Sequence, residues 1–202
     1  MNKFGKYALV AVLVAGFVWT SVQIKRSELK GGNLFVGKGK IEIRSSGRPM
    51  TGRKAPGFSL MSIEGRRVAL SDFKRQPVLL CVWASWNPPS RSALILTPAL
   101  EAKYKDKGLN VITINQGDNE QQVKAIAKAM KFTSVVLLDE DGSVSAKYGA
   151  ERLPTMVLIG KDLKVAWHKD SFMPMEAETL ERKICDALGV EYSQGFGQGR
   201  TK

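Results

Sequence analysis

Two cysteines and one histidine are the side chains of this sequence most able to act as nucleophiles, redox centres or metal ligands. Cys81 and Cys185 are far apart and have neither the C-x-x-C spacing of a redox motif nor the spacing of a zinc site. We expect Cys81, within the apolar run 78–83, and Cys185, on an amphipathic helix, to be buried and unreactive. His168 is expected at the surface or at a strand edge. We predict no metal, haem or nucleotide cofactor, since no suitable cluster or phosphate loop is present in the sequence.

The polar residues in the most informative setting follow that apolar run, in the stretch Val78 to Arg91, VLLCVWASWNPPSR. The continuous run 78–83 predicts a strand that is buried on both faces of a sheet. Pro88 and Pro89 cannot donate hydrogen bonds to a neighbouring strand, but proline is well tolerated in the first turn of a helix. The sequence therefore predicts a buried strand, a short loop and a helix start that presents Asn87.

The segment V-W-A-S-W-N-P-P-S-R resembles the active-site stretch of the membrane-anchored thioredoxin-like proteins of the TlpA/ResA type, in the AhpC/TSA-redoxin superfamily. In that family the stretch reads F-W-A-T-W-C-P-P-C-R. Trp86, the two prolines and Arg91 match family residues, whereas Asn87 and Ser90 stand in place of the two cysteines. The resemblance implies a thiol-disulfide oxidoreductase ancestry with both active-site thiols replaced.

A second similarity is Leu153-Pro154-Thr155, which resembles the family motif G-x-P-T and implies a cis Pro154 beside the active-site loop. The resemblance covers about residues 55–188 and implies a thioredoxin-like α/β fold with a central mixed sheet flanked by helices. Alternation of strands and helices independently favours such a layered fold. The expected strands are 109–115, 135–138, one within the motif 152–159, and 163–167, and the expected helices are 92–107 with a kink at Pro98, 121–131 and 175–188.

The missing thiols decide the predicted chemistry, because disulfide exchange requires attack by a thiolate. Neither an amide nor an alcohol can replace it, and no base is placed by a motif to activate Ser90 as a nucleophile. We therefore predict no catalytic residue. What remains is the family's groove for an extended peptide, which is a case of strand addition. The residues predicted to form it are Trp86, Asn87, Pro88, Pro89, Ser90, Leu153 and Pro154. Asn87 and Ser90 form either a modified recognition surface or a loop that has drifted after losing its function.

The N-terminal part differs in composition from the rest of the chain. Residues 7–24 contain no charge and just reach membrane-spanning length, so we expect an anchor over residues 1–24, with a cleaved signal segment as the alternative. Residues 25–54, with nine Lys/Arg against two Glu, are typical of a basic, glycine-rich linker that contains one small hairpin at most. The predicted domain spans residues 55–188, and residues 189–202 are expected to form a flexible tail.

The formal charge of +12 lies mainly outside the predicted domain. About +7 falls on residues 25–54 and only about +3 on residues 55–202, so no nucleic-acid partner is predicted. The basic stretch is either a solvated linker or a contact for anionic lipid or an acidic partner. Five Lys/Arg between Lys25 and Lys40, against two before the apolar segment, favour a cytoplasmic domain, whereas the family resemblance implies a periplasmic one. Following the resemblance, we expect a single-pass protein of the bacterial cytoplasmic membrane with a periplasmic domain.

Three hypotheses follow. The first is a redox-inactive thioredoxin-like module that binds a protein partner as an accessory or assembly subunit of a membrane or periplasmic complex. The second is a thiol-disulfide oxidoreductase, as in the TlpA/ResA family, that uses Cys81 or Cys185 with an external thiol. The third is a rigid spacer whose basic linker does the binding, in which case changes at residues 87–90 leave function intact.

Overall fold

The computed structural model of the chain describes residues 33–36, 39–42 and 50–193. The chain divides into two units, Met1–Ser45 and Ser46–Lys202. In the first, β1 (Asn33–Val36) and β2 (Gly39–Glu42) pair antiparallel, so the small hairpin expected there is present. No helix of the described residues is long and apolar enough to cross a membrane, and the predicted anchor at residues 7–24 lies outside them.

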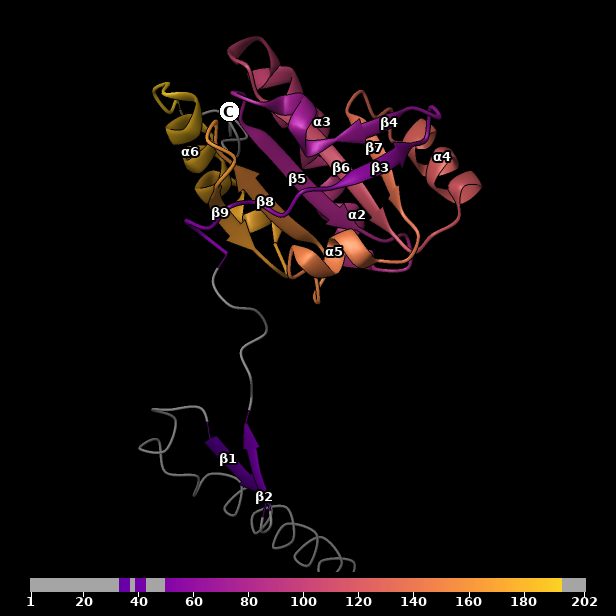
Figure 1. Cartoon of the computed structure of the whole chain (residues 1–202), viewed down its shortest axis with the longest axis vertical. Coiled ribbons are helices and arrows are strands. Elements are labelled where there is room, and N and C mark those ends of the chain that lie inside the picture. Colours follow the sequence, from indigo (N-terminus) through magenta and orange to yellow (C-terminus); the bar gives the residue numbers. More distant parts are fainter. Residues whose placement is uncertain (1–32, 37–38, 43–49, 194–202) are drawn as a thin grey trace, which may run out of the picture. The chain divides into compact units, whose positions relative to one another are not determined.

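The second unit is built on a seven-stranded sheet with the order β4-β3-β7-β6-β5-β8-β9 (Figure 1). Its strands are β3 (Ser59–Ser62), β4 (Arg67–Ala69), β5 (Val78–Trp83), β6 (Asn110–Gln116), β7 (Val135–Asp139), β8 (Thr155–Ile159) and β9 (Val165–Lys169). The three central strands β5, β6 and β7 run parallel, and the remaining pairs are antiparallel. The mixed sheet predicted from the sequence is therefore confirmed.

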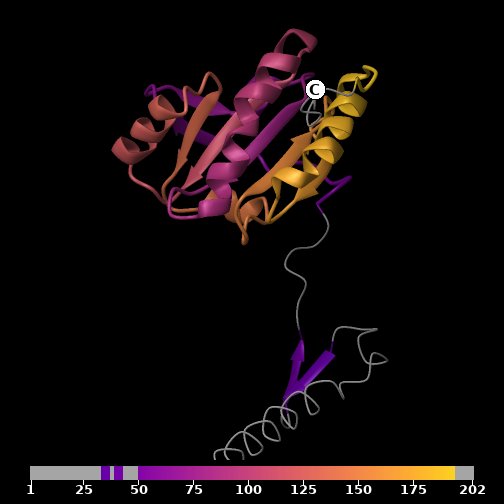
Figure 2. The same ribbon diagram turned by 180° about the vertical axis from the view of Figure 1, so that it is seen from behind.

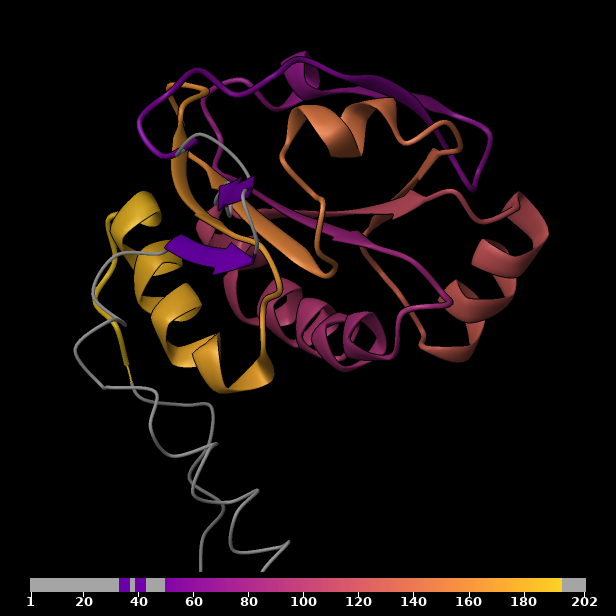
Figure 3. The ribbon, with the colours of Figure 1, turned by 90° about the horizontal axis from the view of Figure 1, so that it is seen from below.

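Helices cover both faces of this sheet. They are α2 (Pro88–Leu94), α3 (Leu96–Tyr104), α4 (Glu120–Ala129), α5 (Ser143–Lys147) and α6 (Ala177–Leu188), with 3₁₀ turns at Leu70–Phe73, Lys105–Lys107 and Pro174–Glu176. Helices α3 and α6 lie side by side across one face (Figure 2). Seen from below, α3, α4 and α6 lie on one side of the sheet and α5 on the other (Figure 3).

Strand β5 shows why its sequence is apolar throughout. Leu79, Cys81 and Trp83 belong to the core beneath α2, α3, α4 and α6, while Val78, Leu80 and Val82 belong to the core beneath α5. All six side chains of the strand are fully buried. A strand covered on both faces has no position for a polar side chain, as expected for the centre of an α/β sheet.

The predicted kink near Pro98 appears as a break between two helices at Ile95. Pro98 has no N–H to donate to the carbonyl of Leu94, four residues earlier, so the regular ladder is interrupted there. The side-chain hydroxyl of Thr97 donates to that carbonyl at 2.9 Å instead. The break leaves α2 as a short helix directly behind the loop that carries Trp86 and Asn87.

The domain's first residues add to its edge. The backbone N–H of Gly52 donates to the carbonyl of Val165 at 2.7 Å, and the N–H of Val165 donates to the carbonyl of Arg53 at 2.8 Å. Residues 52 and 53, which composition placed in the basic linker, therefore pair with the edge strand β9. Of the predicted tail 189–202, residues 194–202 lie outside the described residues.

Candidate functional site

Asn87 caps the helix that follows the central strand, as the sequence predicted. Its backbone is extended, with φ −97° and ψ 107°, and its Oδ1 accepts a hydrogen bond from the backbone N–H of Ser90 at 2.9 Å. Asparagine is among the best residues for this role, because its side-chain oxygen satisfies an N–H that has no partner within the helix. Prolines in the first turn complete a favourable helix start.

Ser90 lies under this loop. Its side chain is fully buried, and its hydroxyl donates to the same Oδ1 of Asn87 at 2.9 Å. The hydroxyl is thus held in an internal hydrogen bond and is enclosed by protein. The expectation that Ser90 offers a polar group to a partner is wrong, because the first turn of α2 directs the side chain inward.

A groove of about 360 Å³ opens beside the loop. Its lining residues are Trp86, Asn87, Gln116, Ala150, Glu151, Arg152, Leu153 and Ser171. The Leu153-Pro154 peptide bond beside the groove is cis, as the family resemblance implied. Trp86 is 68% exposed, so a large aromatic surface is available at the groove's side. Such an aromatic group next to a concave surface is a common anchor for a protein ligand.

The structure therefore brings together only part of the predicted set. Trp86, Asn87 and Leu153 line the groove, whereas Pro154 is buried beside it. Pro88 and Pro89 are exposed on the first turn of α2 but do not line the groove.

Five lining residues were missed by sequence reasoning: Gln116, Ala150, Glu151, Arg152 and Ser171. Gln116 ends β6, which pairs parallel with β5, so the carboxyl ends of both strands meet at one edge of the sheet. This signal was available from the predicted strand 109–115, since ligands commonly bind at that edge of α/β sheets. Glu151 and Arg152 directly precede Leu153. Ser171 follows β9, and no sequence pattern connects it to the loop.

The buried carboxylate of Asp118 holds the loop before Asn87 in place through hydrogen bonds with Ser85. Asp118 accepts hydrogen bonds from the backbone N–H of Ser85 at 2.7 Å and from the Ser85 hydroxyl at 2.9 Å. It also accepts one from Asn115 Nδ2 at 2.7 Å, and Gln122 Nε2 donates to the Ser85 hydroxyl oxygen at 2.7 Å. Charge-assisted hydrogen bonds of this kind are stronger than neutral ones, so the backbone leading to Trp86 is held in one position.

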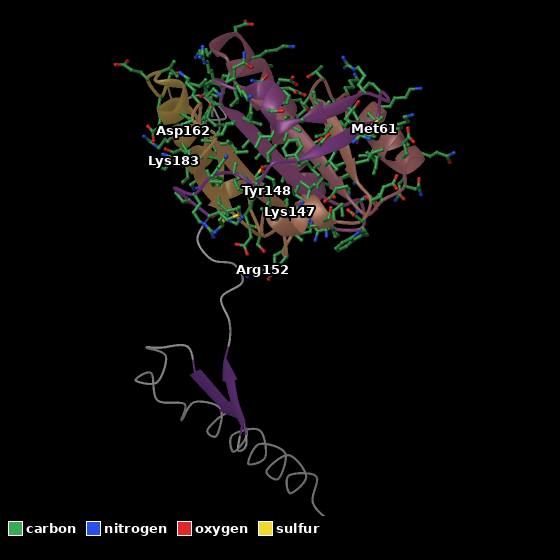
Figure 4. The ribbon with its side chains drawn as sticks, viewed as in Figure 1. Met61, Lys147, Tyr148, Arg152, Asp162 and Lys183 are labelled. Atoms are coloured by element: carbon green, nitrogen blue, oxygen red, sulfur yellow. The ribbon has the colours of Figure 1, made fainter. Side chains whose placement is uncertain are left out.

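The opposite wall is held by Arg152, which projects at the lower edge of the domain in Figure 4. Its Nε and Nη2 donate to Asp170 Oδ2 at 2.9 and 2.6 Å. The carbonyl of Arg152 accepts from the backbone N–H of Ser171 at 3.1 Å and from the hydroxyl of Thr155 at 2.9 Å. These contacts tie the segment before the cis proline to the loop after β9.

Neither cysteine belongs to this groove. Cys81 is fully buried in β5, and burial raises the pKa of its thiol from 9.0 to about 12. Cys185, on α6, is 2% exposed, and its sulfur lies 3.4 Å from the hydroxyl of Tyr104. Both are free thiols. The prediction that they are buried residues is confirmed.

His168 lies on the edge strand β9, half-buried, as the sequence suggested. One of its ring nitrogens, Nε2, is 2.9 Å from the carbonyl oxygen of Tyr148. Ser90 has its own partner in Asn87, so the histidine and the serine do not form a nucleophile and base pair. Within residues 50–193 no group of three or more His, Cys, Asp or Glu side chains could hold a metal ion.

Comparison with known proteins agrees with this geometry. The model of the AhpC/TSA family matches residues 51–168. A thiol-disulfide oxidoreductase ResA from Bacillus thuringiensis subsp. konkukian is 34% identical over 114 residues, which is 56% of this chain and just under two thirds (66%) of the relative. The thioredoxin-like protein YneN from Bacillus subtilis is 33% identical over 132 residues, covering 64% of this chain and 74% of the relative.

Solved structures show the same similarity. A putative thiol:disulfide interchange protein DsbE from Chlorobium tepidum has a TM-score of 0.66 and 34% identity, covering 69% of this chain and 98% of that one. A putative protein disulfide isomerase from Bacteroides thetaiotaomicron has a TM-score of 0.62 and 26% identity, covering 69% and 90%. The fold is therefore thioredoxin-like, and the chain belongs to the AhpC/TSA family, among relatives of the ResA thiol-disulfide oxidoreductase type.

Proposed function

We propose that this protein is a redox-inactive member of its family that binds an extended segment of a partner protein in the groove beside Trp86. In this proposal it acts as an accessory or assembly subunit of a membrane or periplasmic complex. Residues 7–24 anchor it in the bacterial cytoplasmic membrane, with the domain on the periplasmic side.

One observation carries the proposal. The helix start where the family resemblance expects a nucleophilic thiol holds an amide, and the oxygen of that amide is committed to the helix cap. Asn87 cannot attack a disulfide, and Ser90 is enclosed beneath it. A groove is nevertheless present beside them, and its lining includes the exposed Trp86 and the segment before Pro154.

Main-chain groups of the groove support binding of an extended chain. Leu153 lines the groove immediately before β8 and lies outside the strand ladder. Its N–H and carbonyl make no hydrogen bond with another main-chain group of the described residues. A segment in extended conformation can pair with them as an added strand, which gives affinity that depends little on sequence.

The test is insulin reduction with dithiothreitol as electron donor, using the full chain in detergent. We expect turbidity to rise no faster than with dithiothreitol alone. Catalytic reduction of insulin by the purified protein would overturn the proposal.

The names of the relatives favour a second candidate, a thiol-disulfide oxidoreductase that uses Cys81 or Cys185. Both thiols are buried and lie outside the groove, so a substrate disulfide has no route to them in the folded domain. This candidate requires that any measured activity disappear when both cysteines are replaced by serine. Activity that survives the double replacement would exclude it.

A further inference from the structure

The side-chain amide of Asn87 has one orientation that satisfies the helix cap. The backbone N–H of Ser90 is a donor, so the atom 2.9 Å from it must be the amide oxygen. The Ser90 hydroxyl donates to the same oxygen. The Nδ2 group makes no hydrogen bond within the described part of the chain and is not an enclosed atom. It is therefore the end of Asn87 that a ligand in the groove meets.

Gln116 presents the same kind of group. Its Oε1 is enclosed and has no partner among the described residues, and its Nε2 lies close to Gly142. Gln116 and Asn87 line the same groove, from the ends of the neighbouring parallel strands β6 and β5. Asn87 thus offers its N–H₂ group to an occupant, next to the side chain of Gln116.

The charged groups of the groove add a further donor. Arg152 uses Nε and Nη2 to bind Asp170, and its Nη1 makes no hydrogen bond within residues 50–193. Glu151 is the one acidic side chain of the lining, and it is exposed. The lining therefore offers a surplus of hydrogen-bond donors.

From this surplus, and resting on the proposed peptide-binding function, we propose that the partner residue lying against Asn87 is an aspartate or a glutamate. A carboxylate has two oxygens that accept several hydrogen bonds, and bonds from N–H groups to an ionised acceptor are stronger than neutral ones. A cysteine thiolate at this helix start would repel such a residue. The replacement by asparagine removes this negative charge and presents an N–H₂ donor, to which an acidic side chain can bind.

The experiment uses a position-scanning library of seven-residue peptides, fluorescently labelled, whose central residue is fixed as Asp, Glu, Asn, Gln or Ala. Binding to the full chain in detergent is measured by fluorescence anisotropy. We expect the Asp and Glu pools to bind about five- to tenfold more tightly than the Ala pool, the size expected for charge-assisted hydrogen bonds at a partly exposed site.

The decisive variant is Asn87→Asp. Aspartate caps a helix as well as asparagine does, so the fold and the Ser90 contacts are kept, but a carboxylate replaces the accessible N–H₂ group. We expect the acidic pools to bind this variant less tightly than the Ala pool. Urea unfolding of the variant checks that the domain remains folded.

The outcomes separate this inference from the function on which it rests. Peptide binding that is lost in Trp86→Ala but shows no preference for acidic pools, or a preference retained in Asn87→Asp, would overturn the inference alone. Binding of no pool by the wild-type protein would overturn both the inference and the peptide-binding function.

Discussion

The hydrogen bonds between Asn87 and Ser90 lead to an unusual expectation for a pair of alanine substitutions. Asn87→Ala removes the helix cap, which costs about 1 kcal/mol. It also leaves the buried hydroxyl of Ser90 without its acceptor, which costs about 1–3 kcal/mol more. We therefore expect the free energy of unfolding to fall by about 2–4 kcal/mol.

The partner substitution behaves differently. Ser90→Ala removes one hydrogen bond but leaves Asn87 as a working cap, so we expect a loss of about 0.5–1.5 kcal/mol. In the double variant no buried hydroxyl remains unpaired, so the loss should be about 1–2 kcal/mol, smaller than that of Asn87→Ala alone. Removal of a second polar group is thus expected to restore stability.

Urea unfolding of the unit 46–202, followed by circular dichroism, measures all four members of this cycle. For a domain of this size about 1 kcal/mol corresponds to roughly 2–4 °C in melting temperature, so thermal unfolding gives a second readout. A double variant that is as unstable as Asn87→Ala, or less stable than it, would show that the Ser90 hydroxyl does not depend on Asn87. The geometry of the capped loop would then be refuted.

Four further predictions concern the thiols and the loop. Because burial raises the pKa of Cys81 to about 12, roughly one thiol in ten thousand is ionised at pH 8, and iodoacetamide should modify Cys81 in the folded domain at least about a thousandfold more slowly than a free cysteine. Because of the same pKa shift, the thiol of Cys81 loses its proton at lower pH in the unfolded state than in the folded state. The free energy of unfolding should therefore decline as pH rises from 9 toward 12. A urea midpoint that stays constant over this range would contradict the burial of Cys81. Replacement of Asn87 and Ser90 together by cysteine should introduce insulin reduction, since the thioredoxin-like frame is retained; a folded double variant without activity would show that more than the two thiols has been lost. Asp118→Ala should destabilise the domain by about 2–4 kcal/mol, because two donor groups of Ser85 and one of Asn115 lose a charged acceptor. If amide exchange at residues 84–87 stays as slow as in the wild type, Asp118 does not hold this loop in place.

Much of the fold was predictable because it is encoded locally. The uninterrupted apolar run of β5 required a strand covered on both faces, and its burial in two separate cores shows that this reasoning was correct. Pro88 and Pro89 marked the helix start, and Pro98 marked the helix break at Ile95. The cis bond before Pro154 came from the family motif and could not come from composition, because most bonds before proline are trans.

The site was less predictable because its contacts are distant in the sequence. Asp118 supports Ser85 across 33 positions, and no local pattern announces such a pair. Ser171 reaches the groove only because β9 lies beside β8 in the sheet. The inward direction of Ser90 depends on the angle at which α2 leaves the loop. Sequence reasoning therefore located the loop and the cis proline but not most of the residues that line the groove beside them.

The central claim is that an intact groove binds a partner protein without thiol chemistry. It is tested most directly by affinity purification of the tagged full-length protein from gently solubilised native membranes. The groove variant is Trp86→Ala, and the matched control is Ile95→Ala, because the two side chains are 68% and 67% exposed but only Trp86 lines the groove.

We expect a stoichiometric partner with the wild-type protein and with Ile95→Ala that is lost with Trp86→Ala, and we expect it to resist reducing agents. A partner retained by Trp86→Ala, or one released by dithiothreitol, would contradict groove binding without thiol chemistry. Absence of any partner with all three proteins would contradict the role as a subunit.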